Sequence, residues 1–208
     1  MNLYRPATVL VGIALVIIAG LIRLGEPDQV YDDITRYAVR GNVGQTIKGR
    51  DFELTVTRVK FAREIDPRPD DAASSSATPP PEDLPFGTRG IFVTVEFQVL
   101  GKNEAGSVGS ATLQADGGSV YVPVNRTIGT QISIPPPGFL ESSSLAFEAD
   151  PDDLVGLTLW AKKLRGLTVT TADYAIDLGI PDEAVAKDMI AKAEKTYPLR
   201  KSTVRAAS

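Results

Sequence analysis

The chain has 208 residues, a formal net charge of −4 at pH 7 and 43% hydrophobic residues, which suits one folded domain of ordinary size with short appendages. It contains no histidine and no cysteine, so a Ser-His-Asp triad, an imidazole or thiolate metal site, a disulfide and a lipidated cysteine are all excluded. The acidic balance also argues against nucleic acid as a partner.

The first predicted element is an apolar run at the N-terminus. Residues 6–22 carry no charge and are bounded by an arginine at each end, which is close to the shortest length at which a helix spans a bilayer. We therefore expect residues 1–24 to form a single-pass membrane anchor, and the charges around it favour a C-terminal domain outside the cytoplasm. A cleaved signal peptide is the alternative, since Ile17 and Ala19 fit a cleavage site.

Residues 25–42 are predicted to form an amphipathic stalk helix. Pro27 can begin it, Gly41 and Asn42 can end it, and apolar side chains recur between them at three- and four-residue spacing. This stripe either packs on the base of the domain or in the headgroup layer, or it binds another membrane protein. The candidate partner-binding residues are Val30, Tyr31, Ile34 and Tyr37.

From residue 43 to residue 180 the chain is rich in short alternating apolar segments, which are typical of strands. Short turns with Gly, Pro and Asp separate most of them, so neighbouring strands should pair antiparallel. The sequence predicts a mainly β fold, an immunoglobulin-like antiparallel β-sandwich with an N-terminal transmembrane helix and a C-terminal α-helix. The predicted strands are residues 51–63, 89–100, 110–116, 119–124, 139–149, 154–162 and 166–176.

In the first of these strands the apolar residues change faces. Phe52, Leu54 and Val56 share one face, whereas the next large apolar residues have the opposite parity. A β-bulge near Thr57-Arg58 would bring both sets to one inward face. A strand that passes from one sheet to the other would also change its pattern at this place.

One connection is much longer than the others. Residues 64–88 are rich in Pro, Ser, Ala and acidic residues and have no hydrophobic periodicity, which is typical of a mobile loop. The segment is either a solvated spacer or an acidic loop that binds a partner.

The chain is predicted to end with a helix and a basic tail. Pro181 suits the first turn of a helix, and an apolar stripe continues to Tyr197, so we assign residues 181–198 to this helix. Its stripe packs on its own domain or is covered by a partner subunit. Residues 199–208 carry basic residues without an acid, which suits contact with anionic headgroups.

Four segments carry the pattern of a known family: residues 43–61, 89–104, 113–124 and 135–160. They resemble the telokin-like, immunoglobulin-like domain of unknown function found in bacterial exported proteins. Leu113, Asp116, Gly117 and Tyr121 fit its third element, and Pro137, Gly138, Leu145, Phe147 and Glu148 fit its fourth. The resemblance implies a fold rather than an activity. Lipoprotein members have an anchoring cysteine that this chain lacks, and the membrane helix would replace it.

Candidate chemistry is sparse. Asp150, Asp152 and Asp153 cluster in a predicted turn and are candidate Ca²⁺ ligands, although acidic residues are common in turns without a metal. Trp160, the only tryptophan, either stacks on a sugar or packs on the domain surface. We expect no catalytic centre and no cofactor, and therefore no enzyme.

The sequence as a whole predicts a non-enzymatic, membrane-anchored binding domain outside the cytoplasm. We expect an accessory or scaffolding subunit of an envelope membrane assembly such as a transporter, with the lipid bilayer and a membrane protein as partners. The alternative is an extracytoplasmic sensor or carrier domain for an envelope glycan or lipid. A pocket between the sheets would favour the carrier, and a flat apolar patch continuous with the stalk would favour the subunit.

Overall fold

The computed structural model describes the β-rich domain that follows the predicted membrane anchor. The predicted membrane anchor (1–24) lies outside the described residues, and so do Val30, Tyr31, Ile34 and Tyr37 of the predicted stalk. No helix in the described part of the chain is long and apolar enough to cross a membrane. The described residues are 38–67, 85–103, 105–124, 131–163, 173–199 and 202–207, and they belong to one compact unit.

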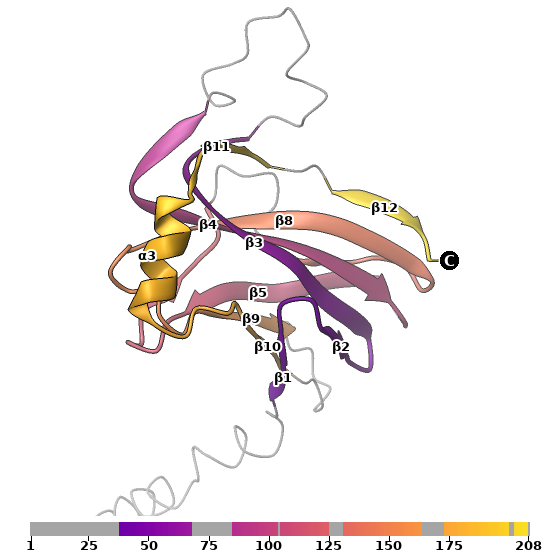
Figure 1. The fold of residues 1–208 in the computed structure, drawn as a ribbon. Helices are drawn as coiled ribbons and strands as arrows, with labels where there is room; N and C mark the ends of the chain where they lie inside the picture. The colour runs from indigo at the N-terminus through magenta and orange to yellow at the C-terminus, as the bar shows by residue number, and fades with distance from the viewer. Residues whose placement is uncertain are drawn as a thin grey trace, which may run out of the picture. The chain divides into compact units, whose positions relative to one another are not determined.

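The domain consists of two β-sheets (Figure 1). Sheet A contains β1 (Ala38–Asn42), β5 (Gly106–Gln114), β6 (Val120–Tyr121), β9 (Thr158–Lys163) and β10 (Asp173–Asp177), in the order β1-β10-β9-β5-β6. Sheet B contains β3 (Phe52–Asp66), β4 (Phe86–Gly101), β8 (Phe139–Ala149), β11 (Glu194–Pro198) and β12 (Thr203–Ala206), in the order β11-β3-β4-β8-β12. The remaining elements are β2 (Thr46–Lys48), which pairs with β3, β7 (Ser133–Ile134), which pairs with β5, and α3 (Glu183–Ala191).

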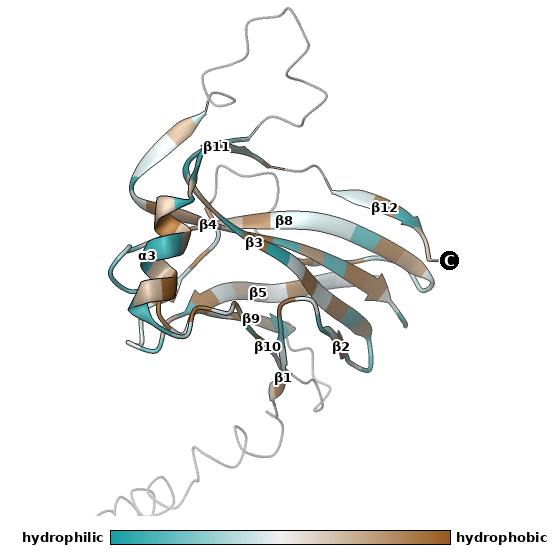
Figure 2. Ribbon diagram, viewed as in Figure 1, coloured by the Kyte–Doolittle hydropathy of each residue, from teal (hydrophilic) through white to brown (hydrophobic). Residues whose placement is uncertain are grey.

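An apolar core fills the space between the two sheets. Apolar and polar residues alternate along much of β3 and β4 (Figure 2). One set of side chains on each strand, such as every second residue from Phe52 to Val56 on β3 and from Ile91 to Val99 on β4, points into this core. The Phe52 ring stacks on Tyr174 of sheet A with 4.5 Å between ring centroids, and Tyr174 Oη donates to the Phe52 carbonyl at 3.0 Å. A β-carbon at position 49 would collide with that hydroxyl, so only Gly49 fits there. The predicted mainly β sandwich is confirmed.

The face change in β3 is caused by a bulge. The register against β4 shifts between Val56 and Arg58, so Thr57 is the extra residue and its hydroxyl donates to the Glu96 carbonyl at 3.2 Å. After the bulge Phe61 faces the same core as the residues before it. The bulge prediction is confirmed. The suggestion that this strand passes to the other sheet is wrong, because β3 pairs with β4 on both sides of the bulge.

Sheet B is also covered on its outer face. A second apolar cluster lies there, made of Ala62, Ile65, Phe92, Ala146, Tyr197 and Leu199. The last two come from β11 and the residue that follows it, so the C-terminal segment lies on sheet B. Every residue of β4 from Ile91 to Phe97 is therefore buried.

The predicted C-terminal helix is wrong in its second half. The helix begins with Asp182, whose side chain accepts from the Val185 amide, and ends at Ala191 instead of residue 198. Residues 194–198 form β11, parallel to β3, because Tyr197 is buried on sheet B instead of continuing the helical stripe. The remaining stripe of α3 packs on the core of its own domain. The predicted basic tail contains β12, which pairs antiparallel with β8.

The predicted end of the stalk is also wrong. Residues 38–42 are β1, which pairs parallel with β10 over all five residues, so the sandwich begins at residue 38 and not at residue 43. The backbone N–H and C=O groups of residues 38–42 form hydrogen bonds with the open edge of β10. In a helix the same groups would have bonded within the segment itself. The long connection is shorter than predicted, since β3 extends to Asp66 and β4 begins at Phe86; residues 68–84 lie outside the described residues.

The other predicted strands are found with shifted ends. Residues 139–149 coincide with β8, and the predicted strands 110–116, 154–162 and 166–176 correspond to β5, β9 and β10. The predicted strand 119–124 shrinks to β6. Strands β2 and β7 were not predicted, because each has no more than three residues and carries no periodicity of its own.

Candidate functional site: a polar hollow on sheet A

A polar hollow of about 490 Å³ lies on the outer face of sheet A. Tyr174 and Ile176 of β10 belong to the core between the sheets, so Ala175 and Asp177 must point outward. The same alternation places Thr158 of β9 outward, beside core residue Leu159. The lining residues are Arg40, Gly41, Asn42, Gln45, Asp116, Gly156, Thr158, Ala175, Asp177, Ile180 and Pro181.

The strand register sets the order of these side chains across the sheet. Arg40 of β1 is opposite Ala175 of β10, which is opposite Trp160 of β9. The next outward-facing row joins Asn42 to Asp177 in the same way. The small Ala175 therefore separates two large side chains, and Trp160 adjoins the hollow on the same face.

A tight approach of two turns fixes one wall of the hollow. Gly156 has a φ of +70°, a conformation that glycine adopts without strain. The carboxylate of Asp116 occupies the place where a β-carbon of residue 156 would lie. The Asp116 amide donates to the Val155 carbonyl at 3.2 Å, and the Gly156 amide donates to the Ile180 carbonyl at 2.8 Å. The position of Asp116 is thus set by backbone contacts.

Two opposite charges share this hollow without pairing. Arg40 and Asp116 are exposed, and within the described part of the chain neither side chain has an ion-pair or hydrogen-bond partner. Asp177 is partly engaged, because its Oδ1 accepts from the Gly179 amide at 2.8 Å. Gln45 Oε1 accepts a hydrogen bond from the backbone N–H of Asn42 at 3.2 Å. The hollow therefore keeps a free guanidinium, a free carboxylate and side-chain amides.

Trp160 packs on the outer face of sheet A, whereas its possible role in stacking on a sugar stays a prediction. Its side chain is partly buried, and Lys162 Nζ lies 5.3 Å from its ring centroid. The tryptophan therefore packs on the sheet with a lysine against it. It does not line the polar hollow itself, but it lies opposite Ala175, which does.

The acidic turn does not form a metal site among the described residues. Asp150 Oδ1 accepts from the Asp152 amide at 3.0 Å, and Asp153 Oδ2 accepts from the Tyr121 hydroxyl at 3.1 Å. Burial, with the hydrogen bond from Tyr121 to Asp153 adding to it, raises the pKa of Tyr121. No group of three or more Asp or Glu side chains in the described ranges is placed to hold a metal ion. Asp150 closes the turn instead, and Asp153 holds Tyr121 of β6.

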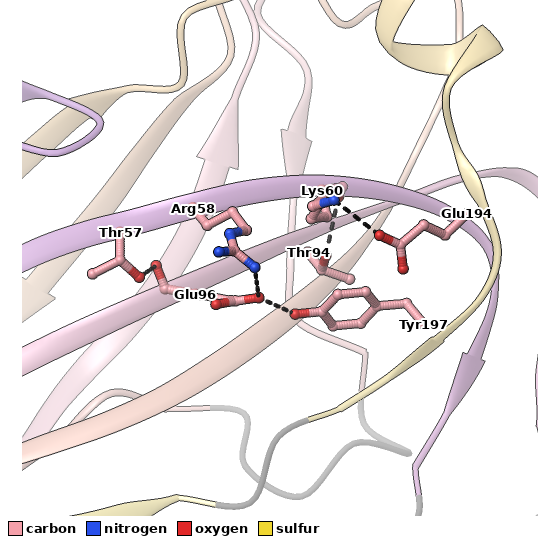
Figure 3. A network of polar contacts seen from close by, with 7 residues as sticks. All are labelled: Thr57, Arg58, Lys60, Thr94, Glu96, Glu194 and Tyr197. Carbon is pink, nitrogen blue, oxygen red and sulfur yellow. Dashed lines mark hydrogen bonds and ion pairs between the residues drawn. The ribbon is translucent and has the colours of Figure 1, made fainter. Parts of the chain in front are cut away.

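A second polar group, on the outer face of sheet B, holds the C-terminal segment in place (Figure 3). The buried carboxylate of Glu96 accepts from the Tyr197 hydroxyl at 2.5 Å and lies 3.9 Å from Arg58. Beside it, Lys60 Nζ donates to Glu194 at 3.0 Å. The Tyr197 and Glu194 contacts join β11 to β4 and β3, and Arg58 of β3 lies near the same Glu96 carboxylate. This group of residues therefore has a structural role.

Most residues of the hollow were missed by the sequence analysis. They come from four separate stretches, 40–45, 116, 156–158 and 175–181, and no local spacing links them. The only signals were Asp116, as a family-pattern residue, and Trp160, as a possible sugar contact.

Fold and hollow define a two-sheet β-sandwich with a polar surface site. Three solved structures are similar to parts of this chain. A secreted protein from Mycobacterium tuberculosis, MPT63, has 13% identity and a TM-score of 0.42, covering 68% of this chain and 98% of that chain. The yjhA protein from Bacillus subtilis has 12% identity and a TM-score of 0.45, with 66% and 99% covered.

The third is an uncharacterized β-sandwich protein from Clostridium difficile 630, with 14% identity and a TM-score of 0.39, covering 68% of this chain and 95% of that chain. No protein-family model matches the chain, and no curated protein matches it.

Proposed function

We propose that the protein is a non-enzymatic binding domain that a single N-terminal helix holds outside the cytoplasm. The observation that carries the proposal is the polar hollow, in which Arg40 projects from β1, Asp116 is fixed against Gly156, and neither side chain has a partner among the described residues. Unpaired, oriented donors and acceptors are what a recognition site needs.

Chain continuity links the hollow to the proposed tether. Strand β1 begins at residue 38, within the range first assigned to the stalk, and it supplies Arg40, Gly41 and Asn42 to the hollow. A ligand in the hollow would therefore lie on the strand nearest in sequence to the anchor. This favours a ligand-binding sensor or carrier domain of the envelope, although its site lies on the outer face of sheet A and not between the sheets.

The immunoglobulin-like assignment is part of the same proposal. Several of the family-pattern residues have structural roles of the kind that a fold pattern would preserve. Leu113, Leu145 and Phe147 are buried in the core, and Gly138 has a φ of +79° immediately before β8. These placements support a domain of the telokin-like kind.

A role as accessory or scaffolding subunit of a membrane assembly is the second candidate. One observation favours it: the predicted stalk, with its stripe Val30, Tyr31, Ile34 and Tyr37, continues into an edge strand. The exposed large apolar residues of the described domain form two separate small groups: Val120 and Val122, in and just after β6, and Phe139 and Val204, on the paired strands β8 and β12.

The test compares two double variants of the full-length protein in a strain that lacks the native gene. One changes the hollow, Arg40→Gln with Asp116→Asn, and the other changes the stripe, Ile34→Asp with Tyr37→Ser. We expect the hollow variant to reach the membrane and to melt at the native temperature. It should nevertheless fail to restore the phenotype of the strain that lacks the native gene. Arg205→Gln on β12 is the matched control, an exposed strand arginine far from the hollow in the sheet order, and it should retain function.

A hollow variant with full function would refute the ligand-binding proposal. Loss of function in the stripe variant alone, together with loss of a membrane protein that co-purifies with the native chain in mild detergent, would establish the subunit role instead.

A further inference from the structure

We infer that the ligand of the hollow is a carbohydrate chain, of which one or two sugar units occupy the hollow, with Trp160 as the stacking surface beside it. This inference rests on the proposed function and names the ligand class of the same site. It depends on three features of the hollow, which are its mixed polarity, the adjoining aromatic ring and its size.

The polarity of the hollow suits hydroxyl groups better than charged or apolar ligands. Arg40 donates only, Asp116 accepts only, and the amides of Asn42 and Gln45 do both. A sugar hydroxyl can accept from one such group while donating to another. The two aspartates that line the hollow, Asp116 and Asp177, would repel a phosphate or a second carboxylate. A lipid chain would leave the charged groups desolvated and unpaired.

The aromatic ring lies where a sugar ring could rest against it. Trp160 is opposite Ala175, and Ala175 lines the hollow. Tryptophan presents a broad apolar ring with a polar N–H, which matches a sugar that has C–H groups on one face and hydroxyls at its rim. Lys162 lies against the ring, but it is exposed, and an exposed lysine–ring contact is weak enough for a ligand to displace.

The hollow is of suitable size and is formed before any ligand arrives. Its volume of about 490 Å³ lies within the range of small-molecule sites. Arg40, Thr158 and Ala175 project from paired strands, and Asp116 is set by the contact with Gly156. Little ordering is therefore needed on binding, which favours affinity.

The single tryptophan gives a direct readout at this site. The full-length protein, in a detergent that contains no sugar, is titrated with oligosaccharides of two to four units released from the envelope polysaccharide of the producing organism. We expect a saturable change in tryptophan fluorescence. Asp116→Asn and Arg40→Gln should each raise the sugar concentration at half-saturation at least tenfold while leaving the melting curve unchanged. Arg205→Gln should leave the half-saturation concentration unchanged. Calorimetry of Trp160→Phe should show a similar weakening without the optical probe.

Two results would overturn the inference. One is the absence of a saturable response to these oligosaccharides, and the other is a response that the hollow variants leave unchanged. A saturable response to the zwitterionic dipeptide Gly-Gly, and none to sugars, would assign the free guanidinium and carboxylate to the two ends of a peptide instead. After any of these results, loss of function of the double hollow variant in cells would still support the proposal that the hollow binds a ligand. Retention of function would refute both that proposal and the carbohydrate inference.

Discussion

The carboxylate of Glu96 is buried on the outer face of sheet B and is bound from two other strands. Tyr197 donates to it at 2.5 Å, and Arg58 lies 3.9 Å away. A hydrogen bond to a buried charged group contributes more to stability than one between neutral, exposed groups. The contact therefore stabilises the position of the C-terminal segment on the sheet.

Removing that hydroxyl should be costly. We expect Tyr197→Phe to lower the free energy of unfolding by about 1.5–3 kcal/mol, as measured by urea denaturation. The matched control is Tyr121→Phe, whose hydroxyl bonds the less buried Asp153 and should cost about 1 kcal/mol or less. Equal losses in the two variants would contradict a special role for the Glu96 contact.

Tyr121 should make stability depend on pH in alkaline solution. Burial raises its pKa above the ordinary value of 10.0, so the folded state keeps the proton longer than the unfolded state does. The resulting stabilisation is fully present below pH 10 and is lost as the pH rises through the pKa of the folded state. We expect the advantage of the native chain over Tyr121→Phe in free energy of unfolding to shrink between pH 9 and pH 12. A constant difference would contradict the raised pKa.

At the scale of elements, strands with strong alternation could be predicted and short edge strands could not. In β4 every second residue from Ile91 to Val99 is apolar and buried in the core, so the sequence pattern and the structure carry the same information. In β11 only Tyr197 is buried, and in β1 no residue is. The apolar residues of β11 and β1 also fit a helical spacing. These segments form strands because they pair with the open edges of β3 and β10.

The strand β1 should contribute to the stability of the domain. A soluble fragment that begins at residue 43 loses the five-residue ladder with β10 and the packing of Val39 on the core, whereas one that begins at residue 37 keeps both. We expect the shorter fragment to lose about 2–3 kcal/mol and to melt about 5–10 °C lower in a circular-dichroism melt. Identical melting temperatures would show that β1 is only loosely attached.

At the scale of the whole molecule, sheet B is completed from the end of the chain. Strand β11 pairs with β3 at one edge, and β12 pairs with β8 at the other. The partners of each pair are more than fifty residues apart in sequence, and the hollow likewise draws on four separate stretches of the chain. Local periodicity indicates strands and a bulge, but it carries no record of which distant strands pair. For that reason a sandwich could be predicted from the sequence while the site on its surface could not.

The double cover of sheet B also has a consequence for hydrogen–deuterium exchange. Between Ile91 and Phe97 both faces of β4 are buried, and β3 and β8 flank the strand along this stretch. Its amides should therefore exchange with solvent deuterons only when the whole domain opens, so their protection factors give the global free energy of unfolding. The residues of β12 are all exposed, and they should exchange through local fraying, orders of magnitude faster. Such a gradient would identify β4 as the last strand to open and β12 as the first.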